Sequence, residues 1–231
     1  MTSPEGQFSK RLRRSEEFRQ LTREHPEMIP LFKTLEAEII KNILEGKAGA
    51  GFSVEQGNMQ AILINQSGET DKNSGPPGAY FKVLFEDQEF FVKRIPGYYE
   101  NQGSLGAHEF DSAQHAQEML DGIENVEVVD FQMGYHDEEK TYFVSKWVDG
   151  ISLESYEVEL ETIMTNEAGG ESAITAEAEL LELTQRFRNI RSRLIHDFTD
   201  VSPHNALYNP PSKKITIFDI HPRKSLSIDS N

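Results

Sequence analysis

The sequence predicts an α+β fold, in which a strand-rich first half precedes a mostly helical second half. Three observations support this prediction. Apolar residues alternate with period two in short segments between residues 59 and 148. After residue 150 they recur at helical spacing over two long segments. Two short strand patterns separated by a Pro-rich turn then follow.

Residues 1–45 are expected to form a helical extension. The apolar residues at helical spacing in its first segment are Phe8, Leu12, Phe18 and Leu21. A second segment, from Leu31 to Leu44, follows the helical period more closely, and Pro26 and Pro30 separate the two. We expect the second helix to pack on a core and the basic residues at 10–14 to form a solvated arm.

Residues 46–148 predict five strands and one internal helix. The strands are expected at 59–65, 79–86, 89–95, 126–133 and 141–148, and the helix at 108–120. Residues 66–78 lack an apolar pattern and are rich in Gly, Pro and Ser, which predicts a loop. An antiparallel five-stranded sheet is the simplest arrangement of these elements.

Residues 149–231 predict a smaller, mostly helical part. Helices are expected at 152–164 and 174–194, and strands at 206–208 and 215–218. Only a short segment follows Asp219, so we expect this second part to be a truncated lobe.

Composition narrows the classes of function. The net charge is −16, and 21 acidic but only 2 basic side chains lie between Glu100 and Glu182. Such a surface repels phosphate backbones, so no nucleic-acid partner is expected, and a basic protein partner is the alternative to a merely solvated face.

The chain has no Cys, which excludes disulfides and thiol chemistry. No apolar run approaches the length of a membrane span, and no signal peptide is recognisable. We therefore expect no membrane partner and a cytoplasmic location. If the protein is a secreted effector, that cytoplasm would be the cytoplasm of a host cell.

Polar residues that suit phosphate chemistry occur in four places. Lys93 lies inside an apolar strand, and Glu109 lies near the start of the next helix. Asp200 and Asn205 share one loop after the long helix, and Asp219 ends the last strand. Each also has an ordinary structural interpretation, as a surface, helix-terminal or turn residue. Their order and context are more specific than any one of them.

This order resembles the protein-kinase-like superfamily. The segment DVSPHNALYNPPSKKITIFDI resembles the catalytic segment of atypical members, such as aminoglycoside phosphotransferases, RIO-type kinases and small bacterial effector kinases. FFVKRI is similar to the strand that carries the family's lysine, and KWVDGISL to its hinge. The resemblance spans roughly residues 59–220 and implies a bilobal fold, with 46–148 as the N-lobe and 149–231 as a minimal C-lobe.

The resemblance also implies roles for individual residues. Lys93, paired with Glu109, would hold the α- and β-phosphates of ATP. Asp200 would be the catalytic base, and Asn205 and Asp219 would hold Mg²⁺. The resemblance further implies that Gly75 and Gly78 belong to the loop over the phosphates, and that Trp147 and Val148 belong to the adenine-binding linker.

The sequence departs from the family pattern at several positions. Phe198 stands where the family usually has His, and the glycines of the 66–78 loop are wider apart than in G-x-G-x-x-G. Ile220 follows Asp219 in place of an aromatic residue.

The sequence therefore predicts an ATP- and Mg²⁺-dependent phosphotransferase, most simply a minimal atypical protein kinase acting on a protein hydroxyl. A pseudokinase that binds a nucleotide or a partner without turnover is one alternative, and a small-molecule kinase of the aminoglycoside phosphotransferase type is another. A metal-dependent hydrolase is the third, with His196, Asp197, His204, Asp219 and His221 as its candidate ligands.

Overall fold

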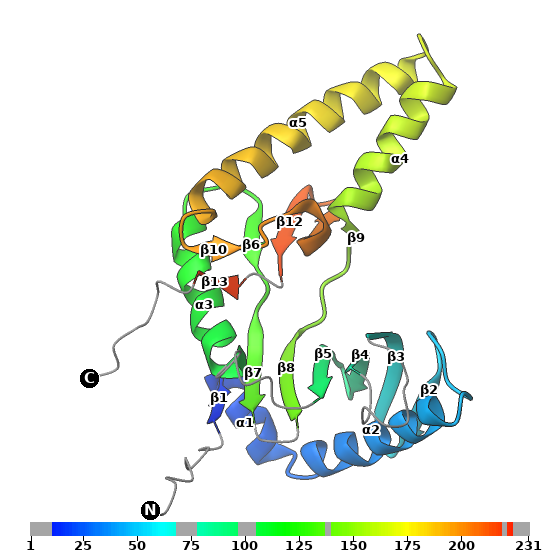
Figure 1. The fold of residues 1–231 in the computed structure, drawn as a ribbon, viewed down its shortest axis with the longest axis vertical. Helices are drawn as coiled ribbons and strands as arrows, with labels where there is room; N and C mark the ends of the chain where they lie inside the picture. Colours follow the sequence, from blue (N-terminus) through cyan, green and yellow to red (C-terminus); the bar gives the residue numbers. More distant parts are fainter. Residues whose placement is uncertain (1–10, 68–77, 97–104, 137–139, 219–220, 224–231) are drawn as a thin grey trace, which may run out of the picture. The chain divides into compact units, whose positions relative to one another are not determined.

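The chain divides into two compact units, each of which is described here by itself. The computed structural model describes residues 11–67, 78–96, 105–136, 140–218 and 221–223 (Figure 1). Unit 1 comprises Met1–Phe110 and Asp130–Trp147, and unit 2 comprises Asp111–Val129 and Val148–Asn231. Residues 111–129, which the sequence predicted within the N-lobe, therefore belong to unit 2.

Unit 1 contains a seven-stranded antiparallel sheet with the order β1-β7-β8-β5-β4-β3-β2. Its strands are β1 (Arg11–Arg14), β2 (Ser53–Gln56), β3 (Met59–Ser67), β4 (Gly78–Phe85), β5 (Gln88–Pro96), β7 (Phe131–His136) and β8 (Lys140–Lys146). The prediction of five strands is wrong, because it missed the two edge strands of the sheet, β1 and β2. Both are polar, and a polar edge strand lacks the apolar alternation from which strands are predicted.

Two helices precede most of this sheet in the chain, α1 (Glu16–Glu24) and α2 (Met28–Leu44). Ser15 begins α1, because its backbone is extended and its side chain accepts a hydrogen bond from the Phe18 N–H. Arg11–Arg14 pairs with β7 as an edge strand, so the predicted solvated arm is wrong for these residues. The predicted helix is likewise wrong at Leu12, which lies in β1, whereas Phe8 lies outside the described residues.

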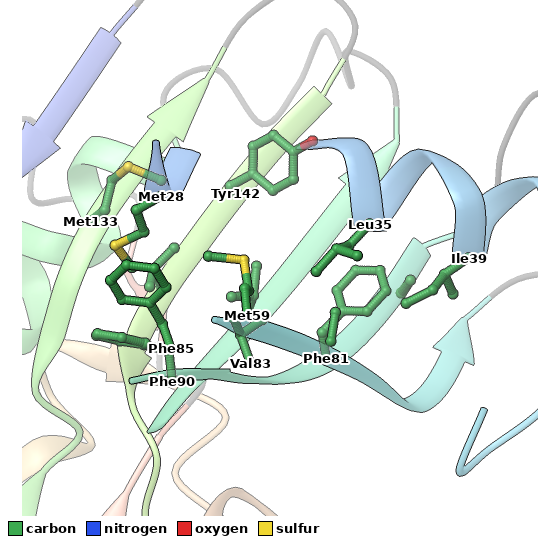
Figure 2. Close-up of a cluster of buried hydrophobic side chains, with 14 of the residues drawn as sticks. Met28, Leu35, Ile39, Met59, Phe81, Val83, Phe85, Phe90, Met133 and Tyr142 are labelled. Atoms are coloured by element: carbon green, nitrogen blue, oxygen red, sulfur yellow. The ribbon is translucent and has the colours of Figure 1, made fainter. Parts of the chain in front are cut away.

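Helix α2 covers one face of the sheet, as its apolar spacing predicted. Leu35 and Ile39 of α2 point toward Phe81 of β4, and Val83 of the same strand belongs to the same buried cluster (Figure 2). Phe18 of α1 also enters this cluster. These side chains are nearly completely buried, and burial of each stabilises the unit by about 1.5–3 kcal/mol.

Unit 2 combines an antiparallel helical hairpin with two small sheets. Its helices are α4 (Leu153–Asn166), α5 (Glu171–Leu194) and the 3₁₀-helix η1 (Pro203–Asn205), and the unit division falls within α3 (Leu105–Leu120). One sheet has the order β6-β12-β11-β9, from β6 (Val126–Val128), β9 (Ile151–Ser152), β11 (Ala206–Asn209) and β12 (Lys214–Ile217). The other pairs β10 (Phe198–Thr199) with β13 (His221–Pro222).

The strand predicted at 126–133 is two strands that belong to different sheets. β6 pairs in parallel with β12 in unit 2, whereas β7 pairs with β8 in unit 1. Alternation of apolar residues continues through both strands, and alternation alone does not identify the pairing partner.

Candidate active site

The Asp200–Asn205 segment forms a tight loop at one end of the small sheets of unit 2. β10 leads into the loop, and η1 leads out of it into β11. The two residues that the sequence singled out here, Asp200 and Asn205, are therefore brought together by a short and closely bonded piece of chain.

Asn205 organises this loop from within. Its side chain is buried, and its Nδ2 donates to the backbone oxygen of Asp200 at 3.0 Å. Its backbone N–H donates to the Ser202 oxygen at 3.0 Å, and its backbone oxygen accepts from the Phe218 N–H at 2.9 Å. The amide orientation follows from the first bond, because the donor end faces Asp200 and the acceptor end, Oδ1, is turned the other way.

Asp200 has a left-handed backbone, with φ of 61°. Asp tolerates this region better than most residues, and such a backbone is often found at functional sites. Its carboxylate is 47% exposed, so a ligand in solvent can reach it. Ser202 Oγ donates to Asp200 Oδ1 at 3.2 Å, and His204 Nε2 lies 3.2 Å from the same Oγ.

The segment before Asp200 is held by contacts that sequence reasoning missed. Phe198, where the resembling family usually has His, is completely buried, and its ring lies 5.9 Å from the His115 ring. Arg223 Nε donates to the backbone oxygens of Ile195 at 2.8 Å and Phe198 at 3.3 Å. Arg223 carried no local signal, because its importance follows only from the pairing of β10 with β13.

Asp219 lies outside the described residues, but Phe218 before it is bonded to the loop, and His221 after it is paired with β10, which precedes the loop. Phe218 donates its N–H to Asn205, as noted above. On the other side, His221 pairs with Thr199 in the β10–β13 ladder. The chain on each side of Asp219 is thus attached to the segment that holds Asp200 and Asn205.

Lys93 lies in unit 1, in the middle of β5. Its neighbours Val92 and Arg94 are buried on the face covered by α2, so Lys93 projects from the opposite face. It is half-buried, and its Nζ lies 5.9 Å from the centroid of the Phe143 ring. In this position the aliphatic stem of Lys93 packs on the sheet and its ammonium group lies over an aromatic ring.

Next to Lys93, a buried ionic cluster joins β5 to α2, and the sequence analysis did not find it. Arg94 Nε donates to Glu36 Oε1 at 2.6 Å, and the Tyr142 hydroxyl donates to Glu36 Oε2 at 2.5 Å. All three side chains are at most 6% exposed. Burial, followed by the Glu36 charge, raises the pKa of Tyr142 above its usual range. The sequence did contain a signal for this cluster, because Glu36 is a charged residue within the apolar stripe of α2.

Three other predicted site residues, Glu109, Gly75 and Gly78, are described to different extents. Glu109 lies in the second turn of α3, because the helix begins at Leu105 rather than at the predicted residue 108, and its side chain is outside the described residues. Gly75 is also outside them. Gly78 is buried and pairs with Ser67 as the first residue of β4, so the prediction that it lies in the loop is wrong.

The predicted linker begins with Trp147, the last residue of unit 1, and continues with Val148, which begins the second segment of unit 2. The Trp147 backbone N–H donates to the Glu89 oxygen at 2.9 Å, and Lys82 Nζ lies 4.5 Å from the indole ring centroid. Further on, a Cβ at Gly150 would lie 3.0 Å from the Tyr208 oxygen. A side chain at residue 150 would therefore require β11 to move by a few tenths of an ångström.

Three candidate ligands of the metal-dependent hydrolase have described side chains, namely His196, Asp197 and His204. Within the described ranges, no group of three or more His, Asp or Glu side chains is placed to hold a metal ion. Asp197 Oδ2 lies 3.4 Å from His115 Nε2, whereas His204 contacts the Asp200–Ser202 pair.

Among the described helices, none is long and apolar enough to cross a membrane.

Comparison with known proteins gives structural neighbours only. No protein-family model and no curated protein sequence matches the chain. The PK-1 kinase of the Cydia pomonella granulovirus is a similar solved structure, with 14% identity, a TM-score of 0.34, and a match over 69% of this chain and 50% of that one. Rad53 (residues 1–466), solved with AMP-PNP, has 18% identity, a TM-score of 0.34, and a match over 72% of this chain and 37% of that one. Both neighbours are protein kinases, and the chain spans half or less of each.

Proposed function

We propose that this protein is an ATP- and Mg²⁺-dependent phosphotransferase that transfers the γ-phosphoryl group of ATP to a protein hydroxyl. The observation that carries the proposal is the Asp200–Asn205 loop. Asp200 has an exposed carboxylate and a left-handed backbone. The buried side-chain amide of Asn205 holds this backbone in place, because its Nδ2 donates to the Asp200 backbone oxygen at 3.0 Å. A loop held in this way can position one carboxylate accurately at the surface.

In the proposed reaction, Asp200 orients the acceptor hydroxyl. The hydroxyl oxygen forms a bond to the γ-phosphorus, the bond between that phosphorus and the ADP oxygen breaks, and the hydroxyl proton passes to the Asp200 carboxylate. Phosphoryl transfer depends on position and charge neutralisation more than on covalent chemistry, so a loop whose geometry is fixed suits it.

Mg²⁺ prefers oxygen ligands, and the residues present fit that preference. Asn205 offers the Oδ1 of an amide whose orientation is already fixed by the bond from Nδ2. Asp219 would supply a carboxylate, since Phe218 before it is bonded to the same loop and His221 after it is paired with β10, which precedes the loop. When bound, the ion would neutralise phosphate charge.

Residues of unit 1, together with Val148 of unit 2, would bind the nucleotide. Lys93 would contact the α- and β-phosphates, with Glu109 as its partner, and Gly75 and Gly78 would lie near the phosphates. Trp147 and Val148 would contact the adenine. The half-buried position of Lys93 on the face of the sheet away from α2 supports this assignment, because that face is not occupied by the core helix.

A protein acceptor is proposed on the basis of charge. Glu154, Glu159 and Glu161 are exposed on α4, in the segment where acidic residues greatly outnumber basic ones. A surface of this kind favours a basic protein substrate over an anionic small molecule. The small-molecule kinase remains the alternative for the acceptor.

The pseudokinase is the second candidate for activity, and Phe198 is the specific observation that favours it. Phe198 is packed into the core of unit 2, so it contributes no polar group to the loop.

The test is transfer of labelled phosphate from ATP, with Mg²⁺, to the protein itself and to basic protein acceptors. We expect transfer by the natural chain, loss of transfer with Asp200→Ala, and normal transfer with Asp121→Asn, which removes an exposed carboxylate elsewhere in unit 2. Thermal stabilisation by Mg·ATP without transfer would favour the pseudokinase. If Mg·ATP produced no thermal stabilisation and no phosphate transfer occurred, the result would refute both the phosphotransferase and the pseudokinase.

A further inference from the structure

Helix α5 has a second apolar stripe that its own unit does not cover. The buried side chains of α5 are Ala173, Ala176, Leu183, Phe187, Ile190 and Leu194. Ile174 and Leu181 are 64% and 72% exposed, and Ala178 between them is also exposed. At 3.6 residues per turn these three residues lie on the side of the helix opposite the buried set.

The spacing of this exposed stripe is that of a coiled-coil seam. Its members are Glu171, Ile174, Ala178, Leu181, Gln185 and Arg188, which follow one another at alternating intervals of three and four residues. All six are exposed. Three of the six, Ile174, Ala178 and Leu181, are apolar and follow one another at consecutive positions of the seam, which is the spacing by which one helix packs along another.

The charges at the two ends of the seam are opposite, and this indicates which partner fits. Glu171 lies at the start of the seam and Arg188 at its end. If a second copy of α5 runs antiparallel, Glu171 of one copy lies opposite Arg188 of the other at both ends. In the same register, Ala178 and Leu181 lie opposite each other at the centre.

The flanking positions are compatible with this register. Glu177 and Glu182 border the seam, and two such acids would repel each other if they met across a dimer. In the antiparallel register Glu177 faces Thr184 of the other copy, and Glu182 faces Thr175. A parallel pairing would instead place Glu171 opposite Glu171 and Arg188 opposite Arg188.

We propose that the exposed face of α5 is a self-association site, at which two copies of this chain pair their α5 helices antiparallel along the seam from Glu171 to Arg188. Helix α5 and its partner α4 form the hairpin of unit 2 in Figure 1. The seam has only two large apolar residues per copy, so the interface is at the small end of the specific range, about 1,000 Å² in total, and we expect a weak dimer.

Sedimentation equilibrium of the full chain tests the proposal, over protein concentrations from about 1 μM to about 1 mM. We expect reversible conversion from monomer to dimer. Leu181→Glu should weaken the dimer at least tenfold, since it buries a charge at the centre of the seam. Val158→Glu is the matched control, because Val158 is a 56% exposed apolar residue on α4 outside the seam, and this variant should dimerise normally.

Charge reversal tests the register. Glu171→Arg and Arg188→Glu should each weaken the dimer, and the double variant should restore it, with circular dichroism used to confirm that α5 remains helical. A chain that stays monomeric throughout, or a dimer that survives Leu181→Glu, would overturn the proposal and leave the face to a different partner. A dimer that the double reversal does not restore would refute the antiparallel register. None of these measurements involves a nucleotide, so their outcome is independent of the proposed enzymatic function.

Discussion

The side-chain amide of Asn205 donates from Nδ2 to the backbone oxygen of Asp200, so the proposed metal ligand fixes the backbone of the proposed catalytic base. One residue thereby acts on two parts of the site. Loss of the amide would disturb the position of the carboxylate as well as the binding of Mg²⁺.

This relationship predicts different results for two variants of the loop. Asp200→Ala should lower the rate of phosphate transfer by about 100-fold or more while ATP affinity changes little, because it removes the proton acceptor and no proposed contact with ATP. Asn205→Ala should lower the rate and also raise the Mg²⁺ concentration needed for half-maximal activity. Rates measured across a Mg²⁺ titration check both. An unchanged Mg²⁺ requirement in Asn205→Ala would contradict the assignment of this residue.

Lys93→Met should raise the apparent KM for ATP and lower kcat. Methionine has a similar length and packing but no charge, so the change isolates the ammonium group. Lys33→Met, which removes an exposed lysine on α2, is the control and should leave both constants unchanged. Equal constants for Lys93→Met and the natural chain would exclude contact between Lys93 and the phosphates.

Glu36→Ala should destabilise unit 1 by about 3 kcal/mol or more, because it removes the carboxylate that accepts from Arg94 and Tyr142 in the core. Urea unfolding measures the change. Glu38→Ala, an exposed acid on the same helix, is the matched control and should alter stability by less than about 0.5 kcal/mol. A similar small effect of Glu36→Ala would mean that the buried cluster adds little to stability.

Stability should fall at alkaline pH, in part through Tyr156. Its hydroxyl donates to Glu179 Oε1 at 3.0 Å, and burial, together with this neighbour, raises the pKa of Tyr156 to about 12 from an ordinary 10.0. A raised pKa means that the folded state holds its proton more tightly than the unfolded chain. The resulting stabilisation is complete below pH 10 and is lost as the pH rises toward 12.

Melting temperatures of the natural chain and Tyr156→Phe, measured from pH 8 to pH 11, check this effect. Because Phe has no proton to lose, the variant should show a smaller decline above pH 9.5 than the natural chain. Parallel declines in the two proteins would show that Tyr156 does not contribute to the alkaline loss.

The sequence predicted the strands of unit 1 best where their apolar alternation was strong. Phe81, Val83 and Phe85 in β4 alternate with half-buried positions, and this pattern is visible in the sequence. The edge strand Arg11–Arg14 has no such pattern. It is a strand because β7 provides hydrogen-bond partners, and that information is not local.

The candidate site was predictable to the extent that it is local. Asp200 and Asn205 are five residues apart, so a tight loop was sufficient to bring them together. Arg223 and Glu36 were missed because each acts on a segment distant in the chain: Arg223 bonds to Ile195 and Phe198, and Glu36 bonds to Arg94. The Arg223 contacts depend on the pairing of β10 with β13, and the Glu36 contact depends on how α2 packs on the sheet, and neither is specified by a local pattern in the sequence.

The most direct test of the central claim is a crystal structure of the full chain with Mg²⁺ and a non-hydrolysable ATP analogue. The proposed function predicts that Lys93 contacts the α- and β-phosphates, that Asn205 and Asp219 coordinate Mg²⁺, and that the Asp200 carboxylate faces the γ-phosphate. A nucleotide bound away from these residues, with Lys93 and Asp200 making no contact with it, would contradict the proposal.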